Sequence, residues 1–108
     1  MTVLTIRASR RYAVRQIVNL QKAGVRPTQG LMIELSSEGC RISNVKRGDF
    51  AVGEDVTLGI GEMALHGRIR WAHDGVVGVR LDTALFANQL TGLIAMGRGQ
   101  DEIVRYGT

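Results

Sequence analysis

Three arginines stand close together near the start of the chain, in the stretch SRRYAVR that holds Arg10, Arg11 and Arg15. Arginine carries a planar, permanently charged guanidinium that meets a phosphate, or the O6 and N7 edge of guanine, with two hydrogen bonds at once. A merely solvated surface would use lysine as well, yet all but two of the 14 basic residues are arginine. The stretch therefore raises the hypothesis of an anionic, guanine-bearing ligand, although a solvated basic tail fits the same spacing.

A second polar stretch, ELSSEGC, places Ser36 three residues before Gly39. Both residue types favour turns, because Ser bonds to its own backbone and Gly accepts positive φ. The Ser36 hydroxyl and the backbone N–H groups of such a turn could form a small concavity that accepts an anion. An ordinary β-turn between two strands explains the same residues.

Residues of the types used in catalysis or metal binding are isolated in this sequence. His66 lies in a strand-like pattern and His73 near a hairpin tip, and neither has ligand neighbours at metal-binding spacing. Cys40 is the only cysteine, which excludes an internal disulfide. Its place on an apolar strand predicts a core residue rather than a nucleophile. We therefore expect neither enzymatic activity nor a metal or cofactor.

Length and charge narrow the class of protein further. The 108 residues predict a single domain, and the 14 glycines favour a β-rich fold with tight turns. The net charge of +4 and the pI near 10.0 indicate an anionic partner: a nucleotide, a nucleic acid or an acidic protein. Because the sequence has no leader-like segment and no long apolar run, we expect a cytoplasmic protein without membrane insertion, either monomer or homodimer.

Short runs of alternating apolar and polar residues, separated by glycine turns, predict strands in a closed or nearly closed β-barrel. The runs cover residues 14–21, 29–35, 40–43, 55–61, 63–73 and 75–82. The loop between the third and fourth runs is expected to turn Phe50 and Val52 inward. Gly67, inside the fifth run, predicts a bulge or a bend.

After the last strand the apolar period becomes helical, with Asp82 or Thr83 as the N-cap and Gly97 just past the end of the helix. Residues 1–10 have weak periodicity and predict a flexible N-terminal arm. The predicted domain covers residues 11–97, and residues 98–108 are expected to form a polar tail.

The two polar stretches are more specific in combination than alone. The arginines read Arg11-x-x-x-Arg15, the turn reads Glu34-x-Ser36-x-x-Gly39, and the runs VGEDVTL, GRIRW and VGVRL follow. This arrangement resembles the PilZ family of bacterial domains, which carry RxxxR followed by (D/N)xSxxG. The resemblance implies a mainly all-β fold, a six-stranded antiparallel β-barrel of PilZ type with one C-terminal α-helix.

The resemblance also implies a function, that of a receptor for the bacterial second messenger cyclic di-GMP, which signals through a protein partner. By similarity, Arg11 and Arg15 grip the phosphates and guanine edges of the ligand, and Arg10 assists them. Ser36 and Gly39 contact the ligand from the barrel surface. Binding in such domains typically orders the arm and presents a new surface to a partner.

The sequence departs from the family pattern at Glu34, which extends the carboxylate of the usual Asp by one methylene. One alternative is therefore a PilZ-like adaptor that no longer binds nucleotide. A third hypothesis is a small basic barrel that binds RNA or DNA, but Trp71 is the only aromatic residue on a predicted strand, which leaves few surfaces for base stacking. Trp71 is interpreted as barrel core or rim. Arg41 and Arg70 are interpreted as solvated strand residues and left out of the site.

Overall fold

The computed structural model describes residues 10–106, and the side chains of residues 10–97. Six strands and one helix lie within these residues. The strands are β1 (Tyr12–Gln21), β2 (Thr28–Leu35), β3 (Gly39–Ser43), β4 (Asp55–Ile60), β5 (Met63–His73) and β6 (Val76–Leu81), and the helix is α1 (Ala87–Tyr106).

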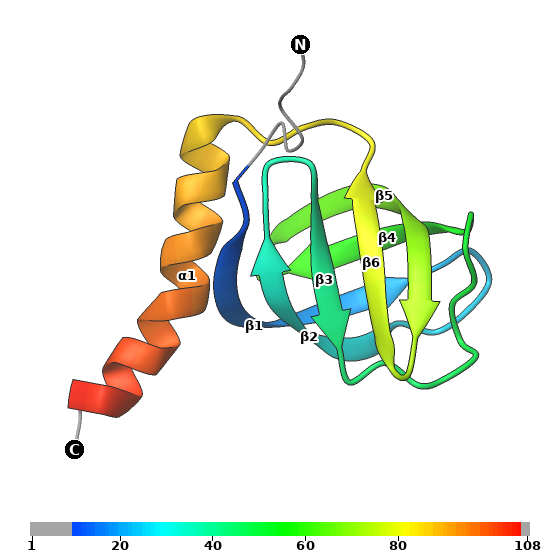
Figure 1. The fold of residues 1–108 in the computed structure, drawn as a ribbon, viewed down its shortest axis with the longest axis horizontal. Coiled ribbons are helices and arrows are strands. Elements are labelled where there is room, and N and C mark those ends of the chain that lie inside the picture. Colours follow the sequence, from blue (N-terminus) through cyan, green and yellow to red (C-terminus); the bar gives the residue numbers. More distant parts are fainter. Residues whose placement is uncertain (1–9, 107–108) are drawn as a thin grey trace, which may run out of the picture.

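The strands close into an antiparallel barrel in the order β1-β2-β3-β6-β5-β4, with β4 pairing back to β1 (Figure 1). Most pairs are neighbours in sequence, whereas the ladders of β1 with β4 and β3 with β6 join strands far apart in the chain. Helix α1 lies outside the barrel against β1. The predicted fold, mainly β with a six-stranded antiparallel barrel and one C-terminal helix, is confirmed.

Alternation along the strands fills the barrel with apolar side chains. On β1, Val14, Val18 and Leu20 are buried and the residues on either side of each are exposed, as the pleat of a strand requires. Burying an aliphatic side chain of this size stabilises the fold by about 1.5–3 kcal/mol relative to leaving it exposed. The largest fully enclosed side chains are Leu20, Met32, Leu35, Ile42, Leu58, Ile60, Ile69, Leu93 and Val18.

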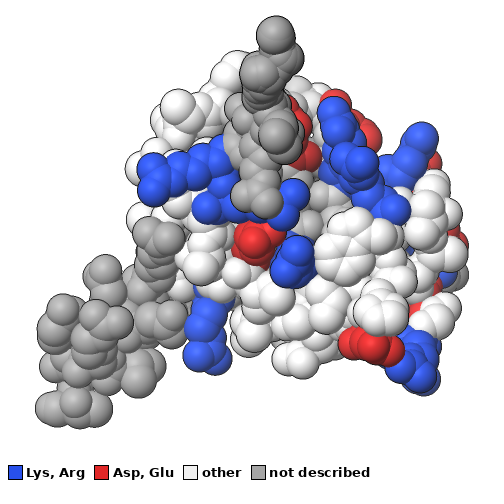
Figure 2. Space-filling view, viewed as in Figure 1, with Lys and Arg blue, Asp and Glu red and all other residues white. Residues whose placement is uncertain are grey.

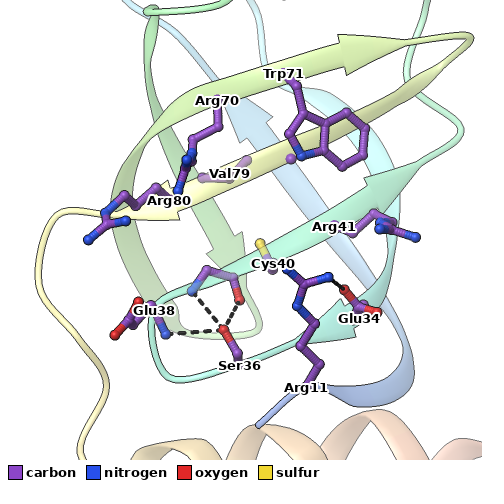
Figure 3. A pocket seen from close by; sticks show the side chains of 12 residues that line it. Arg11, Glu34, Ser36, Glu38, Cys40, Arg41, Arg70, Trp71, Val79 and Arg80 are labelled. Atoms are coloured by element: carbon purple, nitrogen blue, oxygen red, sulfur yellow. Dashed lines mark hydrogen bonds and ion pairs between the residues drawn. The ribbon is translucent and has the colours of Figure 1, made fainter. Parts of the chain in front are cut away.

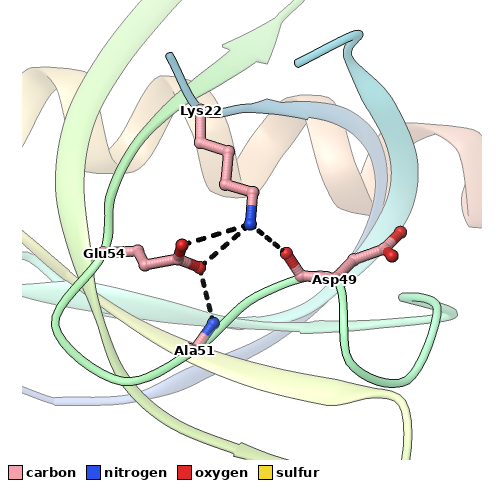
Figure 4. Close-up of polar contacts among 4 residues, drawn as sticks. All are labelled: Lys22, Asp49, Ala51 and Glu54. Carbon is pink, nitrogen blue, oxygen red and sulfur yellow. Dashed lines mark hydrogen bonds and ion pairs between the residues drawn. The ribbon is translucent and has the colours of Figure 1, made fainter. Parts of the chain in front are cut away.

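A lysine fastens the β3–β4 loop to the chain just after β1 (Figure 4). The Lys22 ammonium donates hydrogen bonds to the Asp49 carbonyl and to both carboxylate oxygens of Glu54, at 3.2 and 3.1 Å. It also lies 5.4 Å from the centre of the Phe50 ring, within range of a cation–π interaction. Glu54 in turn accepts the Ala51 N–H at 2.7 Å. These contacts hold the loop across one end of the barrel.

One prediction about the apolar residues of the same loop, that Phe50 and Val52 both turn inward, is only half confirmed. Phe50 is buried, as expected, but Val52 is 68% exposed, so the prediction that both turn inward is wrong for Val52. The Glu54 N–H bonds to the Ala51 carbonyl at 3.2 Å and closes a tight turn. Val52 lies at the tip of that turn and therefore faces solvent.

Helix α1 begins later and ends later than predicted. Neither Asp82 nor Thr83 caps it, because the first helical residue is Ala87. Phe86 takes the cap position instead, and its N–H donates to the Gln89 side chain at 2.8 Å, a contact of the capping-box type. Gly97 does not end the helix, which runs to Tyr106. A Cβ at Gly97 would lie 3.0 Å from Val14 Cβ, so this glycine permits close packing on β1 rather than termination.

Four other expectations concern Gly67, the N-terminal arm, the domain boundaries and membrane insertion. A bulge or bend is expected at Gly67, but the register shift on β5 lies further along the strand, between Ile69 and Trp71. Of the predicted arm, only Arg10 falls within the described residues, and the domain boundaries remain predictions. Helix α1, the one helix of the described residues, is not a candidate for crossing a membrane.

The Lys22–Glu54 contact predicts a pH dependence of stability. The Ala51 N–H and then Lys22 hold the pKa of Glu54 below its ordinary value of 4.5. A lowered folded-state pKa stabilises the native state above the unfolded pKa, and this contribution is lost as the pH falls through the folded pKa. We expect the melting temperature of the parent to exceed that of Glu54→Gln at pH 7, with the difference shrinking below about pH 4.5.

Thermal melts between pH 7 and pH 3 measure this difference, and Glu62→Gln, at an exposed turn glutamate, is the matched control. A difference between parent and Glu54→Gln that stays constant over the whole range would show that the ionised carboxylate does not fasten the loop.

Candidate functional site

A pocket of about 280 Å³ opens on the outer surface of the barrel where β3 lies between β2 and β6 (Figure 3). It runs from the start of β1 across the β2–β3 turn to the middle of β5 and the end of β6. The lining residues are Arg11, Glu34, Ser36, Glu38, Gly39, Cys40, Arg41, Arg70, Trp71, Gly78, Val79 and Arg80. Of the residues predicted from sequence, Arg11, Glu34, Ser36 and Gly39 therefore meet around one pocket.

The Ser-x-x-Gly turn closes on itself. The Ser36 hydroxyl accepts the N–H groups of Glu38 and Gly39, each at 3.2 Å, and the Ser36 N–H donates to the Gly39 carbonyl at 2.9 Å. The predicted concavity of backbone donors is thus filled by the serine oxygen. The turn is a rigid part of the wall that presents Ser36 to the pocket.

Gly39 is required by the close approach of β6. A Cβ at this position would lie 2.3 Å from the Val79 carbonyl oxygen, a distance that no side chain tolerates. The turn is also anchored by backbone hydrogen bonds, because the Leu81 N–H donates to the Glu38 carbonyl and the Leu85 N–H to the Ser37 carbonyl, both at 2.8 Å. The residues that lead from β6 into α1 are therefore tied to the wall of the pocket.

An ion pair lies at the edge of the pocket nearest to β1. Arg11 Nη1 lies 3.6 Å from Glu34 Oε1, because the pairing of Ala13 with Glu34 brings the start of β1 beside β2. Both side chains are partly exposed, so the pair adds little to stability, about 0–1 kcal/mol. The guanidinium of Arg11 is aimed into the pocket and is held by the residue that departs from the family pattern.

The other two predicted arginines lie elsewhere. Arg10 is exposed and its guanidinium stands 5.4 Å from the centre of the Tyr12 ring. Arg15 is an exposed residue of β1. Neither lines the pocket in the described structure.

An aromatic platform forms another part of the pocket, and sequence reasoning missed it. The indole of Trp71 covers Gly78, since a Cβ at Gly78 would lie 2.2 Å from Trp71 Nε1. Arg41 also stacks on Trp71, with its guanidinium 5.4 Å from the centre of the indole. Arg41 Nε is buried and has no hydrogen-bond partner among the residues described. An arginine stacked on a tryptophan presents a flat cationic surface suited to a planar base.

The pocket is more basic than the sequence motifs indicate. Four arginines and two glutamates line it, and Figure 2 shows the basic side chains gathered on this face of the molecule. Arg70 and Arg80 come from β5 and β6, which lie far from the motif residues in sequence, whereas Arg41 stands two residues after Gly39 on β3. Arg41 and Arg70, interpreted from the sequence as solvated strand residues outside the site, both line the pocket. The alternation of apolar and polar residues along each strand predicts that these arginines lie on the outer face of the barrel, but it does not predict which residues of other strands lie beside them.

The cysteine and the two histidines lie apart from one another in the described structure. Cys40 packs against the core, and burial raises the pKa of its thiol from 9.0 to about 12. The thiolate that nucleophilic chemistry requires is therefore scarce at neutral pH. His66 Nδ1 lies 3.1 Å from Thr57 Oγ1, and His73 contacts Asp74. The described residues hold no cluster of three or more His, Cys, Asp or Glu suited to a metal ion.

Fold and pocket together define a small β-barrel domain with a basic ligand pocket on its outer wall. The PilZ domain family model matches residues 5–95, and the chain belongs to this family. Members are cyclic di-GMP receptor and effector domains, generally without enzymatic activity of their own, and they act through protein partners. The resemblance inferred from the arginines and the Ser-x-x-Gly turn is thereby confirmed.

Solved structures show the same fold. One is the PilZ domain of CeSA from a cellulose-synthesizing bacterium, with TM-score 0.62 and 21% identity over 86% of this chain and 99% of that one. Another is the Bacillus subtilis inhibitor of motility, MotI/DgrA, with TM-score 0.64 and 15% identity over 91% of this chain and 52% of that one. At these identities the likeness establishes the fold alone. A search of curated proteins found no match.

The fit of Trp71 over Gly78 predicts a sharp effect of a single methyl group. Gly78→Ala should push the indole off the strand, red-shift its fluorescence and lower the stability by about 1–3 kcal/mol, as overpacking does. Trp71 is the only tryptophan, so its emission reports this site alone.

Gly59→Ala is the matched control, because a Cβ there would meet Asn19 Cβ at an ordinary 3.6 Å. Emission spectra and thermal melts distinguish the two variants. Unchanged emission in Gly78→Ala would mean that the indole does not lie on this strand.

Proposed function

We propose that this domain is a cyclic di-GMP receptor that signals by protein–protein contact. The observation that carries the proposal is the meeting of Arg11 from the arginine motif with Ser36 and Gly39 of the turn around one basic pocket. Membership of the PilZ family supports it. The pocket offers no catalytic arrangement, so the proposed role is binding.

The chemistry of the pocket suits the ligand. Two phosphates and two guanines present acceptors that an arginine fork satisfies with paired hydrogen bonds. Arg11 is the proposed first contact and Ser36 the second. Gly39 remains a proposed contact through its backbone, because the Val79 carbonyl occupies the place of its side chain. The stack of Arg41 on Trp71 offers a surface for one guanine. Arg10 and Arg15 remain proposed contacts that would have to turn toward the ligand.

The output of binding is proposed to pass through the anchored turn. Backbone hydrogen bonds join Ser37 to Leu85 and Glu38 to Leu81, so a shift of the turn would move the segment that enters α1. A partner protein would read that change on the outer surface. The single cysteine is a free, partly buried thiol, in keeping with a reducing compartment, and we propose that the protein is cytoplasmic.

One observation favours a second candidate, an adaptor that binds protein partners without nucleotide. Glu34 stands where the family has Asp or Asn, and it already pairs with Arg11. A ligand must break this contact before it can use the guanidinium. For the third hypothesis, an RNA- or DNA-binding barrel, the structure adds only that the single tryptophan is exposed and could stack on a base.

Calorimetric titration tests the proposed function, with Arg11→Ala as the decisive variant. Removing a charge-assisted hydrogen bond should cost about 1.5–3 kcal/mol, or roughly a ten- to hundredfold loss of affinity for cyclic di-GMP. Arg26→Ala, at an exposed arginine in the β1–β2 turn outside the pocket, is the control and should bind like the parent.

GTP and a short single-stranded RNA serve as control ligands in the same titrations. No heat with cyclic di-GMP at high protein concentration would support the adaptor. Tight RNA binding with a steep salt dependence would support the nucleic-acid hypothesis.

Glu34→Asp is expected to tighten the binding of cyclic di-GMP by a few-fold up to about tenfold, which is within about 1.4 kcal/mol. The shorter side chain holds its carboxylate closer to β2, which weakens the contact with Arg11 and leaves that guanidinium free for the ligand. The same titration measures this change. Weaker binding would instead show that the site is built around the longer side chain.

A further inference from the structure

The wall of the pocket farthest from Arg11 carries two arginines that belong to neither sequence motif. Arg70 comes from β5 and Arg80 from β6, and Figure 3 shows them on the opposite side of the pocket from Arg11 and Glu34. In the barrel order, β3 separates these two strands from β1 and β2. We infer that Arg70 and Arg80 form a second anion-binding pole that holds the other half of a two-ended ligand. This inference rests on the proposed function.

A strand irregularity brings Arg70 and Trp71 to the same face of β5. The β5–β6 register shifts between Ile69 and Trp71, so Arg70 lies in a bulge. Normal alternation would place Arg70 and Trp71 on opposite faces of β5, whereas both are exposed and both line the pocket. Alternation from the buried Ile69 already faces Arg70 outward, so the bulge is what turns Trp71 outward beside it, as bulges commonly do near binding sites.

The strand register also concentrates charge at this pole. Arg80 pairs directly with Arg68 across the β5–β6 ladder, and like charges that stand opposite each other destabilise a sheet. Arg68 is compensated by Asp55, with Arg68 Nε 3.1 Å from Asp55 Oδ1. Within residues 10–97, neither Arg70 nor Arg80 has an ion-pair partner. A bound anion would remove this repulsion.

The carboxylates that line the pocket leave this pole uncompensated. Glu34 pairs with Arg11 on the other side. Glu38 is the carboxylate residue near Arg80, because Gly39 pairs with Arg80, yet it forms no ion pair with either arginine among the described contacts. Positive charge thus remains at this wall, and a phosphate or the O6 and N7 edge of guanine fits two neighbouring guanidinium groups.

Two basic poles on opposite walls of one pocket match a ligand with two ends. A mononucleotide reaches one pole, whereas a cyclic dinucleotide carries two phosphates and two guanines around a ring and reaches both. Arg11 would hold one half and the Arg70–Arg80 pole the other. The second pole would therefore add affinity for the dinucleotide and leave the binding of a single guanine nucleotide unchanged.

The test compares the parent, Arg70→Ala/Arg80→Ala and Arg68→Ala in calorimetric titrations with cyclic di-GMP and with 5′-GMP. Arg68 is the matched control, because it is an exposed arginine of the same hairpin that does not line the pocket. We expect the double variant to bind cyclic di-GMP about ten- to a hundredfold more weakly than the parent. Its affinity for 5′-GMP and the affinities of Arg68→Ala should match those of the parent.

Circular dichroism and thermal melts confirm that each variant is folded before titration. A double variant that binds cyclic di-GMP as tightly as Arg68→Ala would overturn the second pole while leaving the proposed function intact. An equal loss of affinity for 5′-GMP would also overturn it, because a single nucleotide would then contact both walls of the pocket. A parent protein that does not bind cyclic di-GMP would instead contradict the proposed function itself.

Discussion

The close approach of β3, β6 and β5 at two glycines is the constraint on which the rest of the site depends. Gly39 has no room for a Cβ against the Val79 carbonyl, and Gly78 has none beneath the Trp71 indole. Because these side chains are missing, β6 lies against the β2–β3 turn and the indole lies flat on the strand. Any side chain at either position would separate the turn from the aromatic platform and divide the pocket.

This constraint also joins the pocket to the rest of the domain. The turn that Gly39 completes is tied through Glu38 to the end of β6 and through Ser37 to the segment that leads into α1. Helix α1 packs on β1, and β1 begins next to Arg11. The elements around the pocket are thus joined by contacts that lead from the turn through α1 to the start of β1.

The sequence was informative where the signal is local, and less so where it depends on pairing. Alternation around Val18 and Leu20 predicts a strand, and Ser36 with Gly39 predicts a turn, because both signals lie within a few residues. The position of Arg41 beside Trp71 depends on β3 pairing with β6 and β6 with β5, which single-strand patterns do not contain. The bulge that turns Trp71 outward beside Arg70 is invisible for the same reason. The sequence predicts a helix stop at Gly97 because glycine is common just past helix ends. Its packing on Val14 is a tertiary contact, which the sequence does not reveal.

The central claim is that the turn, Arg11 and the Trp71 platform form one cyclic di-GMP site. The most direct measurement is a two-dimensional ¹H–¹⁵N NMR titration of the parent domain with cyclic di-GMP, in which the single indole N–H of Trp71 is resolved by itself. The account predicts that this indole signal and the amides of Gly39 and Gly78 shift together and saturate at the same ligand concentration. Shifts centred on the loop around Phe50 and Val52, with these three signals unmoved, would contradict it.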